Sequence, residues 1–132
     1  MIGSEIIIQL QQKGHKVKNL STRKLSDPNT FQWNPSKHEY DIQAFENVNY
    51  IIHLAGSSIS KRWTKKNKKN ILNSRIQSTV TLFKAIESLP KDKRPRHLIS
   101  ASAIGIYPSH PSKIYTETDE ADNDFLADVV LK

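Results

Sequence analysis

Cysteine is absent from this sequence of 132 residues, and only one methionine and four glycines occur in it. The absence of cysteine excludes a disulfide scaffold, a thiolate metal site and a cysteine nucleophile. No apolar run approaches the roughly 20 residues that a membrane-spanning helix needs, and the first residues lack the pattern of a signal peptide, so we expect none. We therefore expect a soluble, cytoplasmic protein.

Apolar residues are also few, at 36% of the chain, where globular proteins usually have about 45–50% with glycine included. They lie in compact runs, which argues against wholesale disorder. The charge balance is basic, with 20 Lys and Arg against 13 Asp and Glu and a net charge of +7. This length suits one domain that buries about two-thirds of its unfolded surface.

Hydrophobic periodicity predicts alternating helices and strands. Helices are predicted over 2–13 (with Gly14 as its stop), 64–89 and 125–132, and a single helical turn over 41–45. Strands are predicted over 15–20, 31–33, 50–56 and 96–102. The apolar run at 50–56 is typical of a strand that is buried on both faces.

This alternation favours parallel βαβ units, and hence an α/β fold with a doubly wound, Rossmann-like sheet. Such a chain normally opens with a strand, whereas this one opens with a helix. We therefore expect a partial sheet whose first strand is missing. Gly3 suits a position where helix and sheet backbones touch, as the last glycine of a dinucleotide-binding turn does.

Two segments carry possible cofactor chemistry. Arg23, with Thr22, ends the second predicted element, where Rossmann proteins bind the ribose 2′-hydroxyl with an acid or the 2′-phosphate of NADP with Arg. No Asp or Glu lies between His15 and Ser26, so NAD-type recognition has no candidate. The alternative is a solvated basic loop.

Leu54, Ala55 and Gly56 close a predicted strand, and a glycine there permits the close approach of a flat ligand. An ordinary loop glycine is the alternative. At the carboxyl end of the last predicted strand, Ser102 offers a hydroxyl that can orient a substrate carbonyl or alcohol. The alternative, and the commoner explanation of such a residue, is a serine that is satisfied within a turn. No glycines flank it in the G-x-S-x-G manner of serine hydrolases.

A dense basic run covers 61–69 and contains Trp63, which permits a nucleic-acid footprint with an aromatic platform. The alternative is a solvated helix face that the acidic stretch 117–128 balances, and we expect no nucleic-acid partner. The five histidines lack metal-ligand spacing, so we predict no metal site and place His53 and His97 in the core.

Taken together, these pieces resemble the NAD(P)-dependent epimerase/dehydratase family of extended and atypical short-chain dehydrogenase/reductases. Within it they resemble the sugar-epimerase-like subfamily that carries a C-terminal domain of unknown function. The motifs that carry the resemblance are Ile2-Gly3, Gly14-His15-Lys16-Val17, Ser21-Thr22-Arg23, His53-Leu54-Ala55-Gly56, Lys61-Arg62-Trp63-Thr64, Ser74-Arg75-Ile76, Ser100-Ala101-Ser102-Ala103 and Phe125-Leu126-Ala127.

The resemblance implies roles for single residues. Gly3 is the last turn glycine, Thr22 and Arg23 hold the 2′-phosphate of NADP, and Leu54 and Ala55 line the adenine and ribose side. Asn70 and Arg75 align with polar residues that reach the cofactor, although many relatives have Glu in place of Asn70. Ser102 takes the position of the catalytic Ser or Thr.

The sequence departs from the family in two ways. Alignment puts Leu126 and Val130 where the superfamily has its Tyr-x-x-x-Lys acid/base pair, and Tyr107 and Tyr115 are the only phenols nearby. Relatives also have a strand before Gly3 and more than half their length after Lys132. Residues 1–132 are thus expected to form a partial NAD(P)-binding domain, inactive alone, with exposed sheet edges that favour self-association.

The function implied for the intact protein is hydride transfer on a sugar nucleotide or a related alcohol or carbonyl compound, with NADP favoured over NAD. A sensor or scaffold that binds NADP without chemistry is the alternative, since the Tyr-Lys pair is lacking. A second alternative is a small basic nucleic-acid-binding protein.

Overall fold

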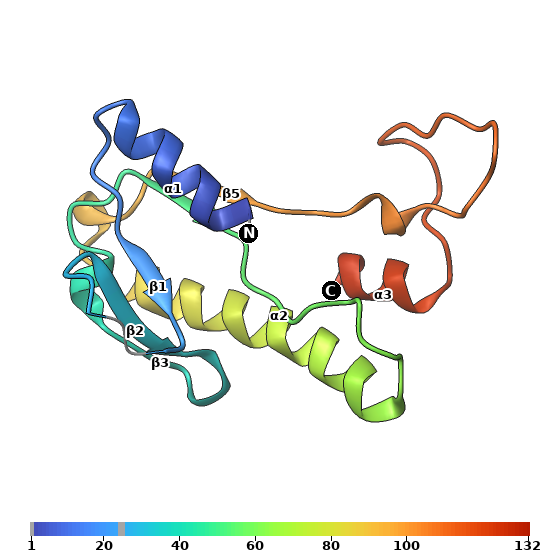
Figure 1. Ribbon diagram of the computed structural model, residues 1–132, viewed down its shortest axis with the longest axis horizontal. Helices are drawn as coiled ribbons and strands as arrows, with labels where there is room; N and C mark the ends of the chain where they lie inside the picture. Colours follow the sequence, from blue (N-terminus) through green and yellow to red (C-terminus); the bar gives the residue numbers. More distant parts are fainter. Residues whose placement is uncertain (1, 24–25) are drawn as a thin grey trace.

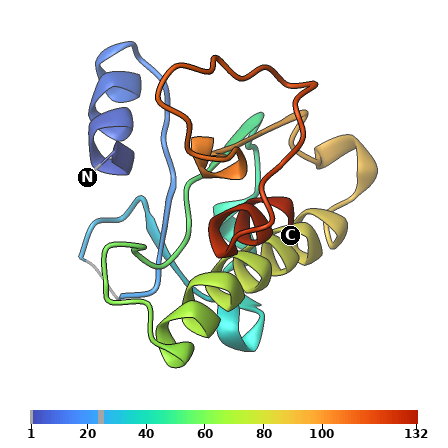
Figure 2. The same ribbon diagram turned by 90° about the vertical axis from the view of Figure 1, so that its right-hand side faces the viewer.

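A computed structural model describes residues 2–23 and 26–132. Its helices are α1 (Ile2–Gln12), α2 (Lys65–Glu87) and α3 (Phe125–Leu131), and its strands are β1 (Asn19–Ser21), β2 (Thr30–Asn34), β3 (Glu39–Tyr40), β4 (Tyr50–His53) and β5 (His97–Ser100). Figure 1 shows α2 running along much of the molecule, with α1 on the opposite side, and Figure 2 shows the same separation from another direction.

The strands form two separate sheets. In one, β2 pairs in parallel with β1 and antiparallel with β3, and in the other β4 pairs in parallel with β5. Parallel strands together with helices confirm the predicted α/β class. Within residues 2–23 and 26–132 no strand bridges β1 and β4, so each has one edge without a strand partner. In the Rossmann strand order the first strand lies between these two strands, so the gap agrees with the expected lack of a first strand.

The core lies between α2 and the strands. Ala44, Phe45, Leu82, Ala85 and Leu89 form its buried cluster, and side chains from β1, β2, β3 and β4 pack against them. Helix α2 begins at a side-chain cap, in which the Thr64 hydroxyl accepts a hydrogen bond from the Asn67 amide at 3.2 Å. Burial of one apolar face explains why a helix rich in lysine is stable at this length.

Among the described residues, only one face of β4 is covered. Ile51 packs against the core and His53 reaches α2, whereas Tyr50 is 62% exposed and Ile52 38% exposed on the other face. The expectation of a strand over 50–56 with both faces buried was therefore wrong, and β4 ends at His53. The core position expected for His97 was also wrong, because its exposed ring stacks on Tyr50 with centroids 4.8 Å apart.

Other boundaries differ locally. The strand predicted over 15–20 forms at Asn19–Ser21, and the short β3 was not predicted. Gly14 ends the first helix as expected, with a φ of 81° that favours glycine. None of the described helices combines the length and the apolarity that a membrane span requires.

Candidate functional site

Thr22 and Arg23 directly follow β1, and both are exposed. The Ser21 hydroxyl accepts a hydrogen bond from the Arg23 backbone amide at 3.0 Å, which shapes the turn. The Arg23 guanidinium has no hydrogen-bond or ion-pair partner among the described residues. Its donors therefore remain open to an anion at the end of this strand.

Leu54, Ala55 and Gly56 follow β4, and Ser102 lies two residues beyond β5. Because β4 and β5 are parallel, these segments leave the same edge of their sheet. A Cβ atom placed on Gly3 would lie 3.7 Å from Leu54 Cδ1, an ordinary contact, so the first turn of α1 borders this edge. An alanine side chain would fit there, so the neighbouring protein atoms do not require the glycine.

Gly56 and Arg75 are in direct contact. A Cβ atom on Gly56 would lie only 3.0 Å from the Arg75 Cζ atom. The same guanidinium donates through Nη1 to the carbonyl oxygens of Ser57, at 3.1 Å, and Ile71, at 3.0 Å. Asn70, also on α2, is exposed, and its side-chain amide has no hydrogen-bond partner among residues 2–23 and 26–132.

His53 joins three elements behind this edge. Its Nε2 atom lies 3.1 Å from the hydroxyl of the buried Ser78 on α2, and its Nδ1 atom lies 3.4 Å from the hydroxyl of Ser100 on β5. Burial lowers the pKa of His53 below its ordinary value of 6.5 because desolvation disfavours the imidazolium. Neutral imidazole is therefore the form that supports the packing of β4 on α2.

Apolar side chains occupy the expected acid/base positions. Leu126, which lies on α3, packs close to Gly105, where a Cβ atom would be 3.3 Å from the Leu126 Cβ atom. Neither Leu126 nor Val130 has a group that exchanges protons. Ser102 is exposed and makes no hydrogen bond through its hydroxyl within the described part of the chain.

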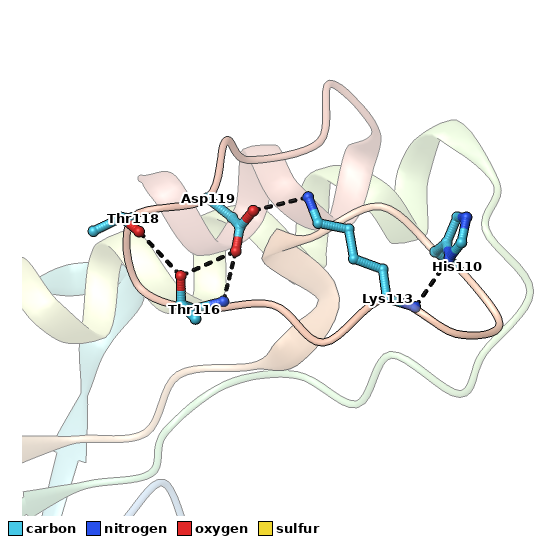
Figure 3. A network of polar contacts seen from close by, with 5 residues as sticks. All are labelled: His110, Lys113, Thr116, Thr118 and Asp119. Atoms are coloured by element: carbon cyan, nitrogen blue, oxygen red, sulfur yellow. Dashed lines mark hydrogen bonds and ion pairs between the residues drawn. The ribbon is translucent and has the colours of Figure 1, made fainter.

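A polar network that the sequence analysis missed orders the segment between β5 and α3 (Figure 3). The Asp119 carboxylate pairs with Lys113 Nζ at 2.8 Å and accepts from the Thr116 amide at 2.7 Å. These bonds, that of Lys113 first, lower the pKa of Asp119 to about 2. An open hollow of about 520 Å³ beside them is lined by Lys113, Asp119 and neighbouring residues, but by no predicted site residue.

The basic run at 61–69 packs partly on aromatic rings. Lys68 Nζ lies 4.8 Å from the centroid of Phe125 and 5.8 Å from that of Trp63, and the two rings meet edge to face. Among the described residues, the ion pairs join Lys113 to Asp119 and Lys132 to Asp128. No ion pair among the described residues links the basic run at 61–69 to the acidic stretch 117–128, which was expected to balance its charge.

Known proteins share the sequence pattern and the fold of this chain. The profile of the NAD dependent epimerase/dehydratase family matches residues 1–126. Epimerase family proteins of Staphylococcus aureus strain NCTC 8325 and Staphylococcus epidermidis are similar at 32% and 35% identity, each over 100% of this chain and 44% of their own length. The chain thus spans less than half the length of these relatives.

Two crystal structures are similar to it. One is human epimerase family protein SDR39U1 (isoform 2) with NADPH, with a TM-score of 0.80 and 24% identity over 99% of this chain and 43% of that one. The other is the nucleoside-diphosphate sugar epimerase of Corynebacterium glutamicum, with a TM-score of 0.79 and 28% identity over 99% of this chain and 26% of that one. The predicted Rossmann-like fold is confirmed.

Proposed function

Because this chain belongs to the NAD dependent epimerase/dehydratase family, we propose that it forms the dinucleotide-binding part of an NADP-dependent, epimerase- or oxidoreductase-like protein of the cytoplasm. The observation that carries the proposal is the Arg23 guanidinium at the end of β1, which has no partner among the described residues and lies beside Thr22 in a segment with no Asp or Glu from 15 to 26. Arg at this position accommodates a 2′-phosphate, whereas an acid would repel it.

The other residues fit the same ligand. Leu54 and Ala55 line the adenine and ribose side, Gly3 lies in the first turn of α1 next to Leu54, and Asn70 reaches the ligand from α2, where Arg75 holds the Ser57 backbone. When bound, the nicotinamide supplies or accepts a hydride. The Ser102 hydroxyl holds the oxygen of a sugar nucleotide or a related alcohol or carbonyl compound, a class supported by the similar nucleoside-diphosphate sugar epimerase.

A second candidate function is that of a sensor or scaffold that binds NADP without turnover. Leu126 and Val130 favour it, because neither can move the proton that accompanies hydride transfer. The measurement that separates the two is turnover of sugar nucleotides, followed at the absorbance of the reduced nicotinamide. Turnover supports the enzyme, and tight NADPH binding without turnover supports the sensor.

The binding test uses two proteins. One is the 132-residue chain, and the other is a chimera in which this chain replaces the matching 44% of the Staphylococcus epidermidis relative. We expect the chimera to bind NADPH and the chain alone to bind it weakly, because the edges of β1 and β4 have no strand partner within the described residues. Micromolar affinity of the chain alone for NADPH would overturn the proposal that the 132 residues form only part of the binding domain. No binding by either protein would overturn the proposed function.

Those edges also predict self-association of the chain alone, since unpaired strand edges template pairing with another chain. A sedimentation coefficient that rises with concentration for the chain, but not for the chimera, is the expected result.

A further inference from the structure

Two consecutive residues of α2 hold the backbone that follows β4. The Ser57 amide donates to the Ser74 hydroxyl at 2.9 Å, and the Ser57 carbonyl accepts from Arg75 Nη1 at 3.1 Å. Both backbone groups of Ser57 are therefore bonded to one helical turn. The Ser74 hydroxyl and Arg75 Nη1 each donate also to the Ile71 carbonyl at 3.0 Å, which ties both side chains to their own helix.

Gly56 completes this arrangement. A Cβ atom there would lie 3.0 Å from Arg75 Cζ and 3.2 Å from each of its two terminal nitrogens. No atom outside the Arg75 guanidinium is among the three nearest within 4 Å, and the φ of Gly56 lies outside the left-handed region. A side chain at this position would have to displace the guanidinium by a few tenths of an ångström, and the hydrogen bonds of Arg75 to Ser57 and Ile71 resist that displacement.

We propose that Ser74 and Arg75 are positioning residues that fix the carboxyl end of β4, and that Gly56 is glycine in order to admit the guanidinium. This reverses the interpretation of Gly56 as an opening for a flat ligand. Arg75 then affects dinucleotide binding indirectly, because it sets the position of the Ser57 backbone. That last consequence rests on the proposed function, whereas the contact between Gly56 and Arg75 does not.

A double-mutant cycle in the 132-residue chain tests the contact. Gly56→Ala should lower the melting temperature by about 3–8 °C, as overpacking does in a domain of this size. In the Arg75→Met background, where the flexible side chain can give way, the same change should have an effect of about 1 °C or less. Lys69→Met, an exposed change on the same helix, is the control and should leave the effect of Gly56→Ala intact. Equal effects in all backgrounds would overturn the proposal.

Hydrogen exchange tests the positioning directly. Ser74→Ala should accelerate exchange of the Ser57 amide about two- to tenfold, the value of one hydrogen bond, while core amides of α2 keep their protection. Ser74→Thr retains the hydroxyl and should restore the slow exchange. Unchanged exchange in Ser74→Ala would contradict the proposal.

The link to the cofactor is measured in the chimera. Ser74→Ala and Arg75→Met should each weaken NADPH binding, and together by no more than the larger single effect, because they act through one loop. Additive losses would mean that Arg75 meets the ligand itself and would overturn its indirect role. A chimera that binds no NADPH at all would instead overturn the proposed function, leaving the outcomes of the cycle and the exchange measurements valid.

Discussion

Acid should weaken the packing of β4 on α2 through His53. His53→Phe keeps a ring of similar size but removes the titratable group and the bond to Ser78. Ser78 still donates to the Arg75 carbonyl at 2.9 Å, so the change leaves no buried hydroxyl without a partner. At pH 7.5 the variant should therefore lose only about 0.5–1.5 kcal/mol of unfolding free energy, the net value of one hydrogen bond.

The sign of the pH effect follows from the direction of the pKa shift. Burial lowers the pKa of His53 in the folded protein below its ordinary 6.5, so the unfolded chain takes up a proton first as the pH falls. The stability from neutral His53 is present above 6.5 and is lost as the pH falls through the lower, folded value. The wild type should consequently approach the variant in stability on acidification.

The assay is urea unfolding followed by circular dichroism at several pH values between about 7.5 and 5. Ser78→Ala is the matched control, since it removes the same hydrogen bond but keeps the histidine, and it should retain the acid sensitivity of the wild type. A difference between wild type and His53→Phe that stays constant or widens toward acid would refute the reasoning.

Three further predictions concern the fold. Phe45→Ala leaves a cavity in the core beside Tyr40 and should lower the free energy of unfolding by about 3–5 kcal/mol, a large part of the typical stability of about 5–15 kcal/mol. Phe83→Ala, on the exposed side of α2, is the control and should cost far less. Equal losses of the two variants in urea unfolding would contradict the assignment of the core. Thr64→Ala should cost about 0.5–2 kcal/mol through the lost helix cap, and Thr64→Ser should largely restore stability. Asp119→Ala should speed hydrogen exchange of the Thr116 amide, and in the wild type that protection should persist down to about pH 3, because the pKa of Asp119 is lowered to about 2; loss of protection near pH 4 would contradict this.

The sequence predicts best what local periodicity determines. The apolar spacing over 64–89 predicts α2 within two residues of its observed ends, and the alternation of helices with strands predicts the class. The β3 strand was missed because two residues give no period. The turn before β3 has a left-handed residue at His38, with a φ of 56°, and the sequence gives no sign of this turn because the position is not a glycine.

Contacts between distant residues account for what was missed in the site. Gly56 looks like a ligand-approach glycine from its place after a strand, yet its neighbour in space is Arg75, nineteen positions later. The apolar run at Tyr50 suggests burial on both faces, but only the face toward α2 has a partner within the described residues. His53 and Ser78 give no sequence signal of pairing, since their contact depends on how α2 lies across the sheet.

The most direct test of the proposed NADP site is a calorimetric titration of the chimera with NADPH and with NADH, before and after Arg23→Asp. A hydrogen bond to a charged group contributes about 1.5–3 kcal/mol, so the chimera should bind NADPH about 10- to 100-fold more tightly than NADH. Arg23→Asp should narrow or reverse that preference, while leaving the melting temperature unchanged, because Arg23 is exposed. Equal binding of the two cofactors by the unmutated chimera would contradict the role given to Arg23.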